Sequence, residues 1–323
     1  MSVCVETLVD ETYRREALRE ATLQGLRAAP KHVPAIWLYD ERGSLLFDEI
    51  TRLPEYYLTR TEREILEERV AEIASETHAD TLVELGSGTS EKIRLLLDAL
   101  VGEGTLRRYV PLDVSEEVLV ASAQKIAEEY PALEVHAVVG DFERHLSALP
   151  AVGRRLFAFL GSTIGGLQTE ARERFLQLVA TSLGPDDALL LGLDLVKDPA
   201  RIVAAYSDST GLSEQFQRNG LAHLDRTLGS DFSQARFQHR AVWDPEQERV
   251  DIGFRSAGAQ VVHVPKLELE VPFADRELLR TGVSAKFRGE RFEGELWAAG
   301  LKLAHWWTDA RNDFALALTV TIR

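Results

Sequence analysis

The chain has 323 residues, of which 45% are hydrophobic and 28% charged, a composition typical of an ordinary globular protein. Its 37 lysine and arginine residues against 52 aspartate and glutamate residues give a net charge of −15. This length suits one large domain or two smaller ones, and the acidity argues against a nucleic-acid partner, because a polyanion needs a basic surface.

The N-terminal segment predicts a cytoplasmic protein. Cys4 is the single cysteine of the sequence, so no intramolecular disulfide can form, which fits a reducing compartment. Acidic side chains recur through the first part of the chain and argue against a signal peptide. The most apolar stretch, residues 188–193, is far shorter than the roughly 20 residues that a membrane helix needs. We therefore expect no membrane partner.

The first regular element that we expect is an amphipathic helix over residues 12–28, followed by an irregular, aromatic-rich segment over residues 30–58. The pattern changes at Thr59. Thr59 and Glu62 have the spacing of a capping box, and apolar residues then recur at helical period. A second helix is therefore expected to begin there.

The middle of the chain alternates between short apolar runs and helical segments. We expect strands at residues 81–85, 109–112, 133–139, 156–160 and 188–193, and helices at about 90–101, 115–129 and 169–183. Strands that are apolar throughout, separated by helices, are typical of a parallel sheet covered on both faces. With right-handed crossovers, such a sheet is a doubly wound α/β fold.

After about residue 200 the pattern becomes one of antiparallel strands. We expect a hairpin of residues 237–243 and 249–255, strands at 261–264 and 267–271, a helix near 290–299, and strands at 301–307 and 314–322. The sequence therefore predicts an α/β domain at residues 60–197. A second, discontinuous α+β domain is expected to consist of residues 1–59 and 198–323.

A glycine-rich turn follows the first strand of the predicted sheet. Gly86, Ser87 and Gly88 come directly after residues 81–85, where glycines permit a tight turn and the close approach of a ligand to the backbone. Glu91 occupies the third position of a dinucleotide fingerprint, and its carboxylate would repel a pyrophosphate. The loop also lacks the Gly-Lys-Ser/Thr of a P-loop.

Two further features sharpen the prediction for this loop. Asp113 follows the second strand, where an acidic residue accepts hydrogen bonds from ribose hydroxyls, and Asp141 and Phe142 follow the third, offering an acceptor and an aromatic face for adenine. Together they indicate a nucleoside site without a phosphate clamp, which is the S-adenosylmethionine (SAM) arrangement of class I methyltransferases. Lys92 is either a partner for the carboxylate of SAM or a solvated helix residue.

Other kinds of site find little support in the sequence. No two of the eight histidines have the i, i+4 spacing of a helical zinc pair, so we expect no protein-bound metal. Ser162 and Thr163 follow the fourth strand, but Gly-x-Ser-x-Gly, the mark of a nucleophile elbow, is absent.

Several sequence strings are shared with one family. They comprise residues 37–40, 43–48, 51–57, 59–62, 84–92, 161–165, 194–198 and 286–287, together with the tryptophan pair at 306–307. The chain resembles, over nearly its whole length, the histidine Nα-methyltransferases of the ergothioneine pathway. The resemblance implies a Rossmann-like SAM domain at residues 60–197 and a substrate-binding domain formed by 1–59 and 198–323. It also implies stepwise trimethylation of an amino acid's α-amine to a betaine, without a metal.

The resemblance also implies roles for five aromatic residues. The two tyrosines that hold the substrate carboxylate match Tyr56 and Tyr206, and a third tyrosine of the imidazole pocket matches Tyr39. The aromatic walls of that pocket match Phe47 and Phe216. Tyrosine hydroxyls suit this role, because they donate to a carboxylate without bringing a competing amine near SAM. Without the resemblance, most of these aromatics would be interpreted as core residues.

Three pocket positions depart from the histidine enzymes. Gly166 stands where the family asparagine contacts the substrate amine. Gly282 stands where a glutamate, two residues before Ser284, pairs with the imidazole, and Ile252 replaces a methionine. A carboxylate is the strongest partner that a pocket can offer an imidazole N–H, so its loss weakens the case for histidine.

The sequence therefore favours SAM-dependent methylation of a free aromatic amino acid larger than histidine, with tryptophan first. The alternative within the same class is an L-histidine Nα-trimethyltransferase with a rebuilt pocket, in which Glu268 or Glu270 supplies the missing carboxylate. A third interpretation is a catalytically silent SAM-binding regulator, against which the intact Tyr56 and Tyr206 argue. No general base is identifiable.

Overall fold

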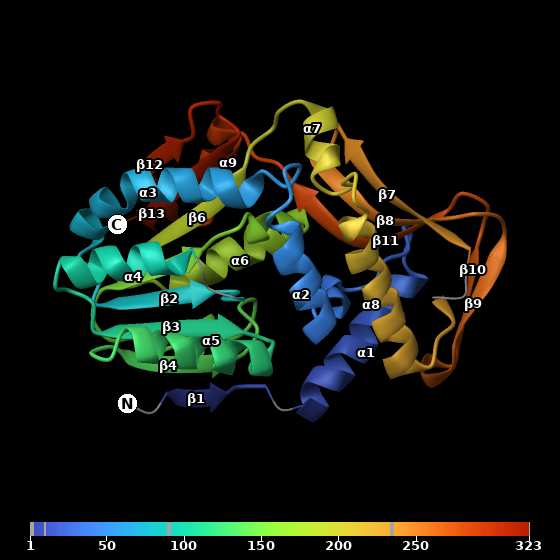
Figure 1. Cartoon of the computed structure of the whole chain (residues 1–323), viewed down its shortest axis with the longest axis horizontal. Helices are drawn as coiled ribbons and strands as arrows, with labels where there is room; N and C mark the ends of the chain where they lie inside the picture. Colours follow the sequence, from blue (N-terminus) through green and yellow to red (C-terminus); the bar gives the residue numbers. More distant parts are fainter. Residues whose placement is uncertain (1–2, 10, 89–91, 233–235, 323) are drawn as a thin grey trace. The chain divides into compact units, whose positions relative to one another are not determined.

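The computed structural model describes residues 3–9, 11–88, 92–232 and 236–322 (Figure 1). The chain forms two compact units: residues 1–9, 58–196 and 286–323 make the first, and residues 10–57 and 197–285 make the second. The internal boundaries lie close to the expected ones near residues 59 and 197. Both ends of the chain, however, lie in the first unit rather than with the second, because strands at both ends join the large sheet of the first unit.

The first unit contains an eight-stranded sheet in the order β1-β4-β3-β2-β5-β6-β13-β12 (Figure 1). Its strands are β1 Cys4–Thr7, β2 Thr81–Leu85, β3 Arg108–Asp113, β4 Glu134–Val139, β5 Arg155–Phe159, β6 Ala188–Asp194, β12 Leu301–Thr308 and β13 Phe314–Thr321. The neighbours from β1 to β6 are parallel, whereas β13 is antiparallel to both β6 and β12. Every residue of β2, β5 and β6 is buried, as expected of a covered parallel sheet.

Helices connect these strands in the manner of a Rossmann-like fold. They are α3 Leu58–Thr77, α4 Ile93–Gly102, α5 Glu116–Glu129, α6 Thr169–Ser182 and α9 Gly289–Ala298, with short 3-10 turns η2 Leu146–Ala148 and η3 Thr163–Gly166. From β2 the chain runs through α4 and α5 to β3 and β4, and it then returns to the other side of β2 for β5, α6 and β6. The order of strands therefore reverses at β2, which confirms the predicted doubly wound sheet. Ligands of such sheets bind at this reversal, beyond the carboxyl ends of the strands.

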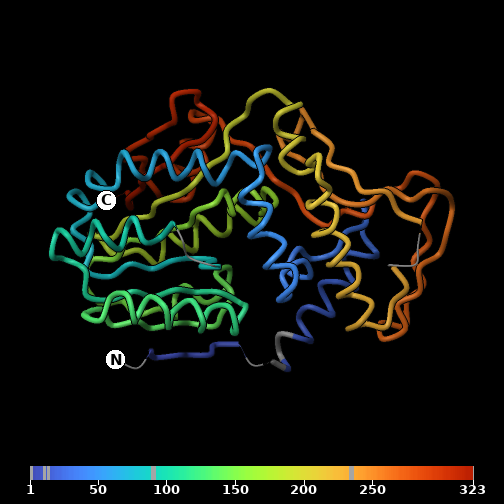
Figure 2. Tube along the Cα trace, in the orientation of Figure 1, coloured from blue at the N-terminus to red at the C-terminus, as the bar shows by residue number. Residues whose placement is uncertain are grey.

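The ends of the chain add three strands to this sheet, which differs from the expected arrangement. The N-terminal strand β1, which was not predicted, pairs in parallel with β4 at one edge (Figure 2). The two C-terminal strands were expected in the second domain, but β13 inserts between β6 and β12. Its first six residues, 314–319, are buried, which is the burial of an interior strand.

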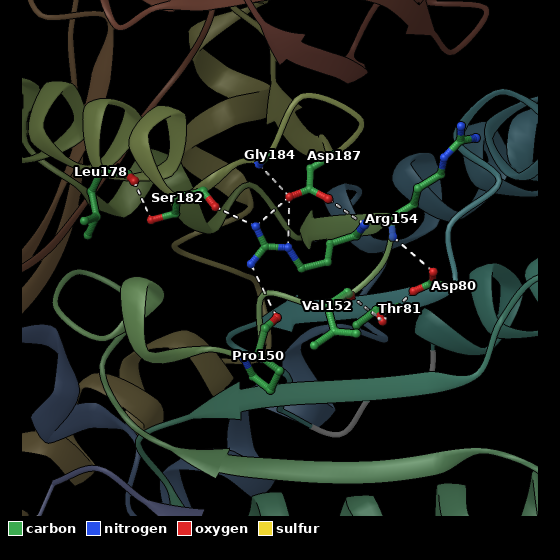
Figure 3. A network of polar contacts seen from close by, with 10 residues as sticks. Asp80, Thr81, Pro150, Val152, Arg154, Leu178, Ser182, Gly184 and Asp187 are labelled. Carbon is green, nitrogen blue, oxygen red and sulfur yellow. Dashed lines mark hydrogen bonds and ion pairs between the residues drawn. The ribbon is translucent and has the colours of Figure 1, made fainter.

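A buried ion pair fixes the amino-terminal ends of β5 and β6 (Figure 3). Arg155 donates from Nε and Nη2 to Oδ2 of Asp187, at 2.9 and 2.6 Å, and its backbone N–H donates to Oδ1 at 2.7 Å. The same Nη2 also donates to the carbonyl of Ser182 at 2.6 Å. The pair lies at the opposite end of these strands from the glycine loop, so it stabilises the sheet and takes no part in the candidate site.

The second unit combines helices with two small antiparallel sheets. Its elements are α1 Glu11–Arg27, η1 Ala35–Leu38, α2 Glu41–Ile50, α7 Pro199–Ala204, α8 Leu212–Leu228, β7 Phe237–Asp244, β8 Arg249–Ser256, β9 Gln260–Val264, η5 Pro265–Leu267, β10 Leu269–Phe273 and β11 Leu278–Ala285. The predicted hairpin is β7–β8, and β11 extends it to three strands, while β9 and β10 pair separately. The segment 30–58, expected to be irregular, contains α2. Neither α8 nor β11 was predicted.

The core of the second unit is mostly aromatic and aliphatic. It includes Trp37 of η1, Leu224 of α8, Phe254 of β8 and Phe273 of β10. Trp37 donates from Nε1 to the hydroxyl of Thr22 on α1 at 2.8 Å, so this buried indole is satisfied and belongs to the core. No helix within the described ranges is long and apolar enough to span a membrane.

Candidate cofactor and substrate sites

The glycine loop after β2 has the backbone that its sequence predicts. Gly86 and Gly88 have φ angles of 71° and 48°, in the left-handed region that favours glycine. Among the described residues, nothing lies within 4 Å of a Cβ built at either position, so a ligand can approach the backbone closely. Ser87 between them is buried. Residues 89–91, including Glu91 of the predicted motif, lie outside the described residues.

Asp113, at the end of β3, is bonded directly to this loop. Its Oδ2 accepts from the N–H of Gly88 at 3.2 Å, and its Oδ1 accepts from the N–H of Ser115 at 2.9 Å. Burial raises the pKa of Asp113, and the backbone hydrogen bonds oppose this effect only partly. Each carboxylate oxygen can accept a further hydrogen bond, so the group remains able to receive ribose hydroxyls.

Asp141 and Phe142 follow β4, as predicted. Asp141 accepts from the N–H of Glu143 at 2.8 Å, which fixes the turn that begins there. The ring of Phe142 lies 4.9 Å from that of Phe159 and 5.7 Å from that of Phe175. Phe142 is therefore half-buried in an aromatic cluster, and the core interpretation and the adenine-binding interpretation both fit its position.

Lys92 is not a solvated helix residue. Its ammonium forms an ion pair with Glu62, whose carboxylate is fully buried, and Oε1 of Glu62 accepts from the N–H of Gly161 at 2.6 Å. The spacing of Thr59 and Glu62 in the sequence predicts a capping box. That prediction is wrong, because α3 begins at Leu58 and Glu62 points to Lys92 and Gly161 instead of back to the helix start.

The loop after β5 carries Gly166, in the turn η3 of the first unit. Within the described part of the chain, nothing lies within 4 Å of a Cβ built on Gly166, so the backbone leaves room for a side chain. In the same loop, the hydroxyl of Ser162 accepts from the N–H of Asp194 at 3.0 Å, and Asp194 forms a fully buried ion pair with Lys286 at 2.6 Å. Ser162 therefore takes part in a structural network.

Five aromatic residues predicted to bind the substrate gather in the second unit. The ring of Tyr39 lies 5.7 Å from that of Phe47 and 5.3 Å from that of Phe216, and the rings of Tyr56 and Tyr206 lie 6.3 Å apart. Phe47 and Tyr56, 6.0 Å apart, connect the two groups. Tyr39 is 40% exposed, which is more than a core residue would be, whereas Tyr56 and Phe216 are buried.

The three-stranded sheet brings the remaining pocket positions together. Ile252 of β8 is paired with Gly282 of β11 and with Ala241 of β7, so one row of the sheet contains two very small residues. The hydroxyls of Ser284 and Tyr206 are 2.7 Å apart. Gly282 does not have a positive φ, and among the described residues nothing lies within 4 Å of a Cβ built there. A larger side chain at residue 282 is therefore compatible with the backbone.

A buried polar pair beside Gly282 was not predicted. A bulge in β11 leaves Thr281 without a cross-strand partner, and the Thr281 hydroxyl donates to Oε1 of Gln217 on α8. Both residues are buried, and Gln217 directly follows Phe216. Glu268 and Glu270, considered as replacements for the missing carboxylate, are exposed, one beside and one within the separate β9–β10 sheet. Their position does not support that role.

One group of possible metal ligands occurs among the described residues. Glu72 and Glu76 of α3 lie near His305 of β12, whose Nε2 is 2.7 Å from a carboxylate oxygen of Glu76. All three side chains reach the surface, where acidic groups are common without an ion. The expectation of a protein without a bound metal stays a prediction.

Comparison with known proteins finds similarity along almost the whole chain. Residues 18–321 match the family described as "Histidine-specific methyltransferase, SAM-dependent". A histidine N-alpha-methyltransferase of Mycolicibacterium smegmatis is 53% identical over 305 residues, which are 94% of this chain and 95% of that protein. Its counterpart from Mycobacterium tuberculosis is 52% identical over 318 residues, 98% and 99% of the two chains. Ergothioneine biosynthesis protein 1 of Neurospora crassa is 30% identical over 314 residues, 91% of this chain and 34% of that protein.

Proposed function

The chain belongs to the family of SAM-dependent, histidine-specific methyltransferases, and from this premise we propose that its substrate is free L-histidine, methylated on the α-amine. That it is a SAM-dependent amino-acid N-methyltransferase follows from the family. The choice of histidine rests chiefly on the 53% identity to an enzyme of that name over 94% of the chain. The further expectation that methylation proceeds to the betaine, in the cytoplasm, without nucleic acid or membrane, belongs to the same proposal.

In this proposal the first unit binds SAM at the reversal of the strand order. Gly86, Ser87 and Gly88 contact it through the backbone, Asp113 accepts from its ribose, and Lys92 meets its carboxylate. Asp141 and Phe142 bind the adenine. The open backbone at the two glycines and the free acceptor capacity of Asp113 support this assignment. Bound SAM supplies an electrophilic methyl group on its sulfonium sulfur.

The second unit is proposed to hold the amino acid. Tyr56 and Tyr206 donate to its carboxylate, and Tyr39, Phe47 and Phe216 surround its side chain. The hydrogen bond between the hydroxyls of Tyr206 and Ser284 supports this role. It places one of the two carboxylate-binding hydroxyls beside the sheet that carries the other pocket residues. The α-amine must be neutral to attack, so the rate is expected to rise with pH through the range in which the bound amine titrates.

One specific observation favours a second candidate, a larger aromatic amino acid such as tryptophan. The row Ala241–Ile252–Gly282 leaves space on the sheet, and no carboxylate stands where the family glutamate would pair with an imidazole. Against this, Gln217 and Thr281 place a neutral polar pair beside Gly282. An amide and a hydroxyl can satisfy the ring nitrogens of histidine, although more weakly than a carboxylate.

A substitution at Gly282 tests the choice of substrate. We expect wild-type protein to show a higher kcat/KM for histidine than for tryptophan. Gly282→Glu should raise the ratio of kcat/KM for histidine over tryptophan by about 10- to 100-fold, since it restores a charged partner for the imidazole. The variant Gly282→Gln, of equal size but neutral, is the control. Wild-type protein that methylates tryptophan and ignores histidine would establish the second candidate.

A further inference from the structure

Four segments of the first unit meet at one buried carboxylate. Glu62 of α3 is 0% exposed, and its oxygens receive the ammonium of Lys92 and the N–H of Gly161. Gly192 of β6 completes the arrangement, because a Cβ at this position would overlap Oε1 of Glu62. The chain therefore brings α3, the start of α4, the loop after β5 and the end of β6 to a single group.

Stability alone gives little reason for this ion pair. A buried pair loses the hydration of both charges, and apolar residues of similar volume often stabilise a core as well or better. The pair also lies at the carboxyl ends of the strands, against Gly192 of β6 and Gly161 after β5, in contrast to the pair of Arg155 and Asp187 at the amino ends. Its position therefore indicates a role in ligand binding.

The ion pair with Glu62 engages only part of the hydrogen-bonding capacity of the Lys92 ammonium. An ammonium has three N–H donors, and the Lys92 side chain keeps 22% of its surface exposed. A lysine stem is flexible, and a solvated lysine has no fixed geometry. The carboxylate of Glu62 removes this freedom, and the Lys92 ammonium lies 3.7 Å from a Cβ built on Gly161, so it borders the loop after β5.

We propose that Glu62 is a positioning residue of the cofactor site. It fixes the Lys92 ammonium and the Gly161 amide so that the N–H groups of Lys92 that Glu62 does not engage face the carboxylate of the methionine part of SAM. This inference rests on the proposed function, in which Lys92 meets that carboxylate. A role that is merely structural would instead support the whole first unit and would affect every part of the bound ligand.

Measuring the affinity for two ligands distinguishes a positioning role of Glu62 from a purely structural one. S-adenosylhomocysteine contains the amino-acid part, whereas methylthioadenosine keeps the nucleoside and the sulfur but lacks the carboxylate. Calorimetry on Glu62→Gln should show an increase of about tenfold in the Kd of S-adenosylhomocysteine, the effect of weakening one charge-assisted hydrogen bond. The Kd of methylthioadenosine should stay unchanged. Equal losses for both ligands, or no loss for S-adenosylhomocysteine, would overturn the proposal.

A double-mutant cycle identifies the residue through which Glu62 acts. Lys92→Met should show the same selective loss, and adding Glu62→Gln to it should cost no further affinity for S-adenosylhomocysteine. The double variant buries no charge, so it is expected to fold even if Lys92→Met does not. A further loss in the double variant would contradict the inference alone. If Lys92→Met folds but shows no selective loss, the assignment of Lys92 in the proposed function fails instead.

Discussion

At the scale of single residues, Asp113 links acidity to cofactor binding. Burial raises its pKa above the ordinary value of 3.8, while ribose hydroxyls would donate to its ionised form and lower the pKa in the complex. Binding therefore favours loss of a proton. The affinity for the cofactor is therefore expected to be full above the raised pKa of Asp113 and to decline as the pH falls through that pKa.

We accordingly expect the affinity for S-adenosylhomocysteine to be constant near neutral pH. Below the raised pKa of Asp113 it should fall by up to about tenfold per pH unit. Titration calorimetry over this range checks the prediction. Asp113→Asn should bind more weakly by about 1–3 kcal/mol at neutral pH and should lose the pH dependence. A wild-type affinity that is flat down to pH 3.8 would exclude this role for Asp113.

The candidate residues that were predicted without the family resemblance are those with a local signal, whereas the substrate-binding residues were predicted from the resemblance. Gly86 and Gly88 could be predicted because a positive φ after a strand requires glycine. Glu62 could not, because its partners Lys92 and Gly161 lie 30 and 99 positions along the chain. The pair of Gln217 and Thr281 was missed for the same reason, with 64 positions between them.

At the scale of elements, the N-terminus of helix α8 is capped by a side chain that does not belong to the N-cap residue. The N-cap residue is Gly211, with a φ of 78°, and it offers no side chain. Asp208 acts instead, since its carboxylate accepts from the N–H groups of Thr210, Leu212 and Ser213 at 3.0, 3.1 and 2.7 Å. Because the acceptor stands three residues ahead of the expected site, sequence pattern did not reveal the helix that carries Phe216.

The same aspartate yields a stability prediction. Burial alone would raise the pKa of Asp208, but hydrogen bonds from Thr210 and Ser213 outweigh it, and the pKa lies below 3.8. Asp208→Ala should therefore lower the free energy of unfolding by about 1–2 kcal/mol at neutral pH. The difference from wild type should shrink as the pH falls below 3.8, because the unfolded chain then takes up a proton at Asp208, and it should vanish once the pH falls through the lowered pKa of the folded state.

Chemical denaturation at several pH values measures this effect. Asp275→Ala, which removes an exposed aspartate of the same unit, serves as the control and should leave the unfolding free energy nearly unchanged. An equal loss in the two variants, or a difference that grows on acidification, would show that Asp208 does not cap α8.

Most strands of the large sheet could be predicted from the sequence, but the sheet to which the C-terminal strands belong could not. The strands from β2 to β6 were predicted because each is an apolar run between helices, and their parallel order follows from the crossovers. The runs that became β12 and β13 were also predicted, but not their partner. β13 pairs in antiparallel register with β6, which lies more than a hundred residues earlier in the chain, and no turn connects the two strands. Local pattern therefore identifies such strands without assigning them to a sheet.

At the scale of the whole molecule, each compact unit contains one group of candidate residues. The proposed cofactor residues belong to the first unit, and the aromatic cluster with Ser284 and Gly282 belongs to the second. Gly166 is the exception, because it was predicted with the substrate residues but lies in the first unit. The two units divide near residues 58 and 197, close to the expected domain boundaries, whereas β1, β12 and β13 at the ends of the chain complete the large sheet of the first unit.

We propose that the chain transfers a methyl group from SAM to the α-amine of free histidine. The most direct measurement offers purified protein an equimolar mixture of amino acids and SAM with an isotopically labelled methyl group, and then locates the label by mass spectrometry. We predict labelled histidine with the methyl groups on the α-nitrogen, and no labelled histidinamide when that compound replaces histidine, because the amide lacks the carboxylate for Tyr56 and Tyr206. Label on another amino acid in place of histidine, or on none, would contradict the proposed function.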